Sequence, residues 1–200
     1  MIQDSYETKR WFNKDNQLHR KRLPAVVRKS KDSEWWVNGV RHRDNGPAIE
    51  RNWDGSTQYW QNGVLHNADG PAVIHLDGST MYYKQGQLHR ENGPAKYSVT
   101  QGVTAWYSNG VCHRTDGPAE IYKNGKKRWL LNGMLHRDNR PAVETAHSQE
   151  WFKNGLRHRI DGPAIITKTK RRWFINNVEY TEESFEVHKR MSSWGLKINV

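Results

Sequence analysis

HRDNGPA, at residues 42–48, is the clearest copy of a segment that recurs along this 200-residue chain. The other copies are HRKRLPA (19–25), HNADGPA (66–72), HRENGPA (89–95), HRTDGPA (113–119), HRDNRPA (136–142) and HRIDGPA (158–164). Successive motif histidines are 22 to 24 residues apart, and each of the seven prolines stands five residues after one of them. A fixed period of this length indicates a repeat protein.

An aromatic pair precedes each copy of the motif. The pairs are Trp11-Phe12, Trp35-Trp36, Tyr59-Trp60, Tyr82-Tyr83, Trp106-Tyr107, Trp129-Leu130, Trp151-Phe152 and, with no motif after it, Trp173-Phe174. A turn dipeptide such as Asn38-Gly39 follows each pair, and Asn-Gly tolerates the positive φ angles of a tight hairpin. Each pair is therefore predicted to end a strand.

Adjacent residues of a strand face opposite sides of the sheet. The first member of each pair is always Trp or Tyr, so we expect it to form the packed face. The second member varies, so we expect it to be more exposed. The candidate exposed aromatic face consists of Trp36, Trp60, Tyr83, Tyr107, Phe152 and Phe174.

These patterns predict an all-β fold, an elongated antiparallel meander of about seven 23-residue β-hairpin repeats. The array is predicted over residues 1–180, and a capping helix and tail over 181–200. Thr181 suits a helix N-cap, and acidic and basic residues stand at the matching ends of TEESFEVHKRM (181–191). Phe185, His188 and Met191 share one helical face, and the tail is expected to add a strand or to pack Trp194 against the end of the array.

Paired aromatics, then NG, then HRxDGPA at a period near 23 resemble the MORN-type β-hairpin repeats. The resemblance covers roughly residues 9 to 180 and is strongest to the degenerate version found in proteins of bacteriophages and large DNA viruses and in some bacterial antitoxin-like proteins. The glycine-rich YxGxW phrase of eukaryotic MORN units is absent. The phospholipid-binding and protein-docking roles of those units are therefore not carried over. The resemblance implies the fold more than the function, and the function that it implies is a phage-type accessory, anti-defence or antitoxin-like role.

The His, Arg and Asp of the motif also raise the question of catalysis or metal binding. Equivalent residues two strands apart are spaced by about 9 to 10 Å, too far to share one ion. A catalytic constellation is normally unique, whereas this motif occurs in seven copies. We therefore predict that it turns the chain, with no catalytic, metal or cofactor residues. The single cysteine fits a reducing compartment, and the absence of an apolar leader predicts a cytoplasmic protein, in the host cytoplasm if viral.

The net charge of +11 is unevenly distributed. Residues 1–31 carry nine Lys/Arg against three acids, residues 32–100 six against eight, and residues 101–200 seventeen against ten. Many of these cations fall in the variable turn before the aromatic pair. The candidate binding rim consists of Arg28, Lys29, Lys31, Lys126, Lys127, Arg128, Lys168, Lys170, Arg171 and Arg172.

Two functions fit these features. The first is a non-enzymatic module that binds and inhibits a host or cognate protein, in particular an acidic one, through its aromatic face or basic rim. The second is nucleic-acid binding, with the rim on phosphates and the exposed rings stacked on bases. An enzyme with a nucleotide-binding groove stays a third alternative.

Overall fold

A computed structural model describes residues 2–3 and 7–193 of the chain. These fall into two compact units, Met1–Gly110 (unit 1) and Val111–Val200 (unit 2), and each is considered by itself. Both are built from antiparallel β-hairpins, and one short helix stands near the C-terminus. The predicted all-β meander with a helical cap is confirmed.

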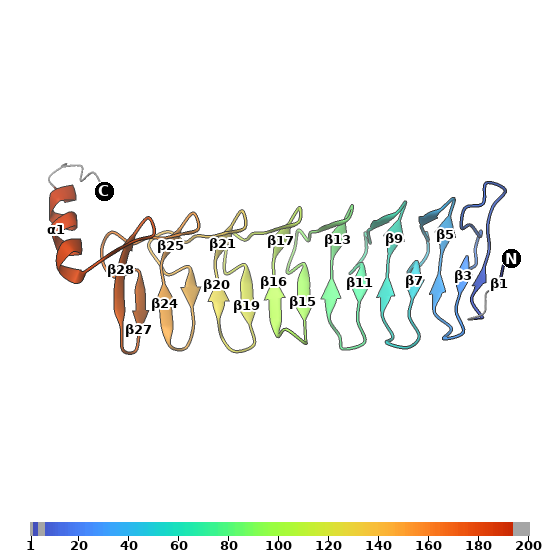
Figure 1. Cartoon of the computed structure of the whole chain (residues 1–200), viewed down its shortest axis with the longest axis horizontal. Coiled ribbons are helices and arrows are strands. Elements are labelled where there is room, and N and C mark those ends of the chain that lie inside the picture. The colour runs from blue at the N-terminus through green and yellow to red at the C-terminus, as the bar shows by residue number, and fades with distance from the viewer. Residues whose placement is uncertain (1, 4–6, 194–200) are drawn as a thin grey trace. The chain divides into compact units, whose positions relative to one another are not determined.

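Unit 1 contains one antiparallel sheet whose strands pair mostly in chain order. Its strands are β1 (Ile2–Gln3), β2 (Lys9–Arg10), β3 (Val26–Val27), β4 (Ser33–Glu34), β7 (Ile49–Glu50), β8 (Thr57–Gln58), β11 (Val73–Ile74), β12 (Thr80–Met81), β15 (Lys96–Ser98) and β16 (Val103–Ala105). Each pairs with the next in this series. Turns between paired strands therefore recur along one margin of the sheet (Figure 1).

Unit 2 repeats this arrangement. Its sheet consists of β19 (Glu120–Tyr122), β20 (Lys127–Arg128), β23 (Val143–Glu144), β24 (Ser148–Glu150), β27 (Ile165–Thr167) and β28 (Arg171–Ile175), again paired in this order. The final strand, β29 (Val178–Tyr180), pairs with β28.

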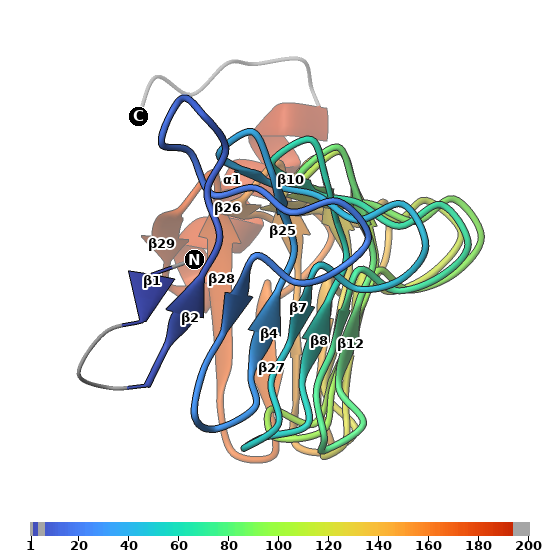
Figure 2. The same ribbon diagram turned by 90° about the vertical axis from the view of Figure 1, so that its right-hand side faces the viewer.

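A second set of strands, of two residues each, lies at the opposite margin from the turns, where the chain bends away from the main sheet (Figure 2). They are β5 (Trp36–Val37), β6 (Val40–Arg41), β9 (Trp60–Gln61), β10 (Val64–Leu65), β13 (Tyr83–Lys84), β14 (Gln87–Leu88) and β17 (Tyr107–Ser108) in unit 1, and β18 (Val111–Cys112), β21 (Leu130–Leu131), β22 (Met134–Leu135), β25 (Phe152–Lys153) and β26 (Leu156–Arg157) in unit 2. Each repeat thus has two hairpins, and the chain leaves the main sheet at the aromatic pair.

The first aromatic of a pair marks this break. The N–H of Trp35 donates to the carbonyl of Ala48, and the Trp35 carbonyl accepts from the N–H of His42. The second aromatic, Trp36, then begins the short hairpin. The prediction that the pair ends a strand is confirmed for the main sheet, but the second aromatic opens a separate hairpin that the pattern did not indicate.

The turn dipeptides have the predicted backbone. Asn38 and Gly39 have φ angles of 47° and 79°, and Asn132 and Gly133 have 51° and 78°. Positive φ at both central residues is the requirement of a type I′ hairpin turn, which Asn-Gly meets with little strain.

The core of each unit is thin and repetitive. The alanine of every Pro-Ala step is fully buried; these residues are Ala25, Ala48, Ala72, Ala95, Ala119, Ala142 and Ala164. The next residue is also buried in several repeats, as at Val26, Ile49 and Val143. Because no exposed area remains at the alanines, a larger side chain there would force the backbone apart.

The predicted cap is the helix α1 (Glu182–Ser193), which packs against β28 and β29. The Thr181 hydroxyl accepts the N–H of Ser184, so Thr181 is the N-cap as expected. Phe185 is fully buried, whereas Met191, predicted on the same face, is 37% exposed. No helix in the described part of the chain is long and apolar enough to cross a membrane. The tail with Trp194 lies outside the described residues.

Candidate functional site

The motif histidines hold neighbouring repeats together. In all seven, Nδ1 accepts the backbone N–H of the turn residue in the following repeat, at 3.0 to 3.3 Å. The donors to His19, His42, His66, His89, His113, His136 and His158 are Asn38, Asn62, Gln85, Asn109, Asn132, Asn154 and Asn176. Residues 2–3 and 7–193 contain no cluster of three or more potential metal ligands. The motif histidine therefore acts as a link between repeats.

The motif arginine has an equally structural position. The Arg43 guanidinium lies 3.8 Å from the centre of the Trp35 ring and donates to the Pro47 carbonyl at 2.9 Å. A Cβ at Gly46 would stand 3.2 Å from the Arg43 guanidinium carbon, so this glycine leaves room for the arginine. The corner arginine packs in the same way over the first aromatic of four other pairs, whereas the corner after Tyr59 has Asn67 in its place.

The second aromatics do not form the predicted exposed face. Phe152 and Phe174 are 8% and 7% exposed, and Trp36, Trp60, Tyr83 and Tyr107 are half-buried. The predicted order of burial holds at Trp35-Trp36 but is reversed at Trp129-Leu130 and Trp173-Phe174.

The physical reason lies in the second strand of each short hairpin. The Arg41 guanidinium lies over the rings of both Trp36 and Trp60, at 4.7 and 5.3 Å from their centres. Arg157 is placed in the same way between Phe152 and Phe174, at 5.3 and 5.9 Å. These four rings are therefore covered by an arginine from a short hairpin, which periodicity alone does not show.

The predicted basic rim divides into paired and unpaired cations. Arg28, Arg128 and Arg172 form ion pairs with Glu34, Glu120 and Glu179, and Lys29 with Glu7. Lys126 is half-buried with its ammonium group 5.6 Å from the centre of the Tyr122 ring. Lys31, Lys127, Lys168, Lys170 and Arg171 are exposed, with no ion-pair partner among the described residues. Of these, all but Lys31 belong to unit 2 and are called its basic turns below.

The Arg172 pair shows why three of the four rim arginines are not free. Its guanidinium donates two hydrogen bonds of 2.7 Å to Glu179, which lower the pKa of that carboxyl. A partner would have to displace this carboxylate before it could bind Arg172.

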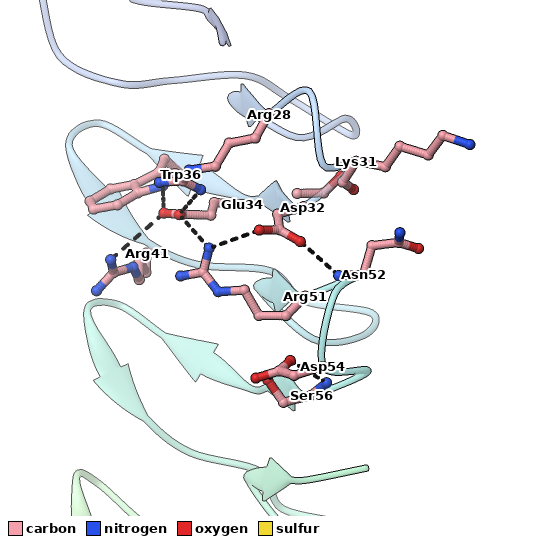
Figure 3. Close-up of polar contacts among 11 residues, drawn as sticks. Arg28, Lys31, Asp32, Glu34, Trp36, Arg41, Arg51, Asn52, Asp54 and Ser56 are labelled. Carbon is pink, nitrogen blue, oxygen red and sulfur yellow. Dashed lines mark hydrogen bonds and ion pairs between the residues drawn. The ribbon is translucent and has the colours of Figure 1, made fainter. Parts of the chain in front are cut away.

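Unit 1 buries two carboxylates beneath its first strand-joining turns (Figure 3). Glu34 and Asp32 are 3% and 4% exposed. Glu34 accepts hydrogen bonds from Arg28 and from the Trp36 indole, and Arg41 stands 3.6 Å away. Burial would raise the pKa of the Glu34 carboxyl, but these hydrogen bonds and charges bring it below its ordinary value. Sequence reasoning missed this cluster.

Arg51 links the two buried carboxylates. Its guanidinium is 3.3 Å from Glu34 and 3.9 Å from Asp32, and the Asp32 carboxylate also accepts the Asn52 N–H at 2.7 Å. These contacts join the first strand-joining turn to the second. The cluster is a structural network in which three arginines surround two buried carboxylates.

Three turn residues of unit 1 form an exposed series that sequence reasoning also missed. Trp53, Leu76 and Val99 are 73%, 77% and 45% exposed and lie in the β7–β8, β11–β12 and β15–β16 turns. They are 23 residues apart, so they occupy similar places in successive repeats. A Cβ on Gly55 would stand 2.9 Å from the Leu76 side chain, which thus lies across the preceding turn. These three residues are called the apolar turn ridge.

Cys112 offers no reactive thiol. Burial, and to a smaller extent the charge of Glu120, raises the pKa of its thiol to about 12. Because the thiolate is the nucleophilic form, the raised pKa makes this thiol a poor nucleophile at neutral pH.

The sequence matches no known family of proteins, and a search of curated proteins likewise finds no match. Function is therefore argued from the surfaces described above.

Proposed function

We propose that the protein is a non-enzymatic binding protein that holds a partner protein through the apolar turn ridge of unit 1. The exposure of Trp53 and Leu76, above 70% each, is the observation that carries the proposal. Large apolar side chains exposed in register on successive turns are typical of an interaction site, and Trp is prominent among residues that dominate binding energy.

The spacing of the ridge favours one kind of partner. Its members are two strands apart, so they recur about every 9 to 10 Å. Residues seven apart on an α-helix are separated by about 10.5 Å along its axis. An amphipathic helix with an apolar residue at every seventh position therefore matches the ridge.

The negative charge beside the ridge favours a partner helix with basic residues. Asp54 and Asp77 adjoin the ridge, and hydrogen bonds from Ser56 and Ser79 lower the pKa of these carboxyls. Lysine or arginine flanking the apolar positions of the partner would meet these carboxylates. The basic turns of unit 2 would attract an acidic part of the partner and speed association.

A non-enzymatic role is supported by the use of the corner motif. Its histidine accepts a hydrogen bond from the next repeat and its arginine lies over a ring, so both serve the fold in each unit. The resemblance to repeats of phage and antitoxin-like proteins favours a host or cognate protein as the partner, inhibited by binding.

Nucleic-acid binding keeps one supporting observation, the exposed basic turns of unit 2. The exposed aromatic rings that would also have supported it are absent, because no ring of the predicted aromatic face is exposed enough to stack freely on a base. It predicts affinity for nucleic acid that weakens steeply with salt.

The test uses a fluorescent helical peptide with leucine at every seventh position and lysine beside each leucine. A control peptide has the same composition with leucine at every fifth position. We expect the first peptide to bind the whole protein at least about tenfold more tightly than the second, because only the first presents its apolar residues on one face. The change in anisotropy on titration measures both affinities.

The matched variants are Trp53→Ser with Leu76→Ser, and Ile160→Ser, which removes a 65% exposed apolar side chain elsewhere. The double substitution should weaken peptide binding by about tenfold or more, and Ile160→Ser should leave it unchanged. Equal binding of both peptides, or full binding by the double variant, would refute the proposal.

A further inference from the structure

The corner loops of unit 1 form three similar clefts. Each is lined by the corner loops of two successive repeats and by an aromatic residue of the second repeat. Their cavity volumes are ≈ 520, ≈ 520 and ≈ 480 Å³, so the three have nearly the same size. This size falls within the range of small-molecule sites.

The clefts differ sharply in charge. The first corner cleft is lined by Arg20, Lys21, Arg22 and Arg43, with Asp44 as the one carboxylate among its lining residues. The second has one arginine against two aspartates, and the third has two cations against two carboxylates. An excess of cations is therefore confined to the first of the three.

This excess comes from the first copy of the motif. HRKRLPA places Lys21 and Arg22 where HRDNGPA has Asp44 and Asn45. Both cations are exposed, with no ion-pair partner among the described residues. Arg20, in contrast, already lies 4.1 Å from the centre of the Trp11 ring, as the corner arginines do elsewhere. The positive charges of Lys21 and Arg22 are thus not neutralised by an ion pair among the described residues.

The backbone at this corner is also unusual. Arg22 has a φ of 66°, in the left-handed region that favours Gly and Asn. At the sixth corner, the aligned position holds Asn139, with a φ of 57°. A corner needed only as a turn would be better served by asparagine. Strained residues of this kind are concentrated at functional sites.

Hydrogen bonding within the cleft points the same way. The Trp35 ring lines the cleft, and its buried indole N–H has no acceptor. The Asp44 carboxylate stands 3.0 Å from Nε2 of His42. The cleft therefore holds an excess of donors over acceptors.

We infer that the first corner cleft binds a phosphate monoester of nucleotide size, with Lys21 and Arg22 on the phosphate oxygens. Arg43 is already paired with Glu50 at 2.7 Å, so the other three lining cations exceed Asp44 by two charges. A phosphate monoester carries a charge of about −1.5 to −2 at neutral pH, which offsets this excess better than a carboxylate or a phosphodiester. The site is separate from the apolar turn ridge and does not depend on the function proposed for it.

The experiment is calorimetric titration of the whole protein with adenosine monophosphate, adenosine and a dinucleoside phosphodiester. Adenosine monophosphate should bind, and adenosine and the diester should each bind at least about tenfold more weakly. Equal binding of the diester would overturn the inference in favour of a nucleic-acid backbone. Equal binding of adenosine would overturn it in favour of base recognition.

The variant Lys21→Asp with Arg22→Asn introduces the residues that the second corner has at these positions, Asp44 and Asn45. It should fold, because asparagine suits a positive φ. It should lose at least about tenfold in affinity for adenosine monophosphate. The control Lys168→Asp with Lys170→Asn makes the same change in net charge in unit 2 and should bind normally. The variant Lys21→Arg with Arg22→Lys, which keeps the charge, should also bind.

Unchanged binding by Lys21→Asp with Arg22→Asn would overturn the inference. An equal loss in the unit 2 control would also overturn it, because net charge alone would then account for binding.

Discussion

The strand-joining turns of unit 1 and unit 2 occupy the same place in the repeat but carry different side chains. Three turns of unit 1 present Trp53, Leu76 and Val99, and two turns of unit 2 present exposed lysine and arginine. The corner motifs at the other margin are alike in the two units: His42 and His136 each accept a turn N–H at 3.1 Å. Side chains that recur in every repeat hold the fold, and those that change between units are available for binding.

The largest expected effect concerns two glutamates at equivalent positions. Glu34 pairs with Val26 and Ile49, and Glu150 pairs with Val143 and Ile165. Glu34 is 3% exposed among three arginines, whereas the Glu150 side chain is 26% exposed with Arg157 at 3.6 Å.

Glu34→Ala should lower the free energy of unfolding of unit 1 by about 3 kcal/mol, because three half-buried arginines and the Trp36 indole lose their shared buried acceptor. Glu150→Ala should lower that of unit 2 by about 1 kcal/mol or less. Urea unfolding with hydrogen exchange resolved by unit measures both. Equal losses would show that the buried cluster does not distinguish the units.

Acid should destabilise unit 1 by protonating the Glu34 carboxylate. The pKa of the Glu34 carboxyl is below its ordinary value in the folded state, because hydrogen bonds and charges from arginines outweigh burial. Its stabilising contribution is therefore present above the unfolded pKa, about 4.3, and is lost as pH falls through the folded pKa. The urea concentration at the unfolding midpoint of unit 1 should therefore decrease when the pH is lowered below about 4.3. Glu34→Gln should make this decrease smaller. An identical pH profile in the variant would assign the loss to other carboxyls.

The corner histidines should behave alike in the two units. The side chains of His42 and His136 are 18% and 14% exposed. Replacing either by alanine leaves a turn N–H without its acceptor, so each unit should lose about 1 to 3 kcal/mol of unfolding free energy. The urea midpoints of the two variants measure this, and a loss in only one unit would contradict a common structural role.

The smallest effect is expected at the basic turns of unit 2. Lys168→Gln, Lys170→Gln and Arg171→Gln remove exposed charges with no ion-pair partner among the described residues. The free energy of unfolding of the triple variant, measured by thermal unfolding, should differ from that of the unsubstituted protein by no more than about 0.5 kcal/mol. A larger loss would mean that these turns stabilise the fold, contrary to their assignment as binding surface.

The repeat period, the Asn-Gly turns and the N-cap at Thr181 could be predicted because each rests on local backbone preferences. The separate short hairpins could not, because alternation along a strand does not say where the chain leaves a sheet. The prediction of an exposed aromatic face was wrong for a related reason, because Arg41 covers Trp36 and Trp60 from another strand. The 23-residue spacing of Trp53, Leu76 and Val99 was present in the sequence, but single apolar residues in turns give no signal until exposure is known.

The central claim is that the turn residues that differ between units serve binding and not stability. Trp53→Ser with Leu76→Ser tests it most directly, with affinity for the seven-spaced helical peptide and the urea midpoint measured on the same sample. We predict a loss of about tenfold or more in affinity with an unfolding free energy within about 0.5 kcal/mol of the unsubstituted protein. Unchanged affinity, or a large loss of stability, would contradict the account.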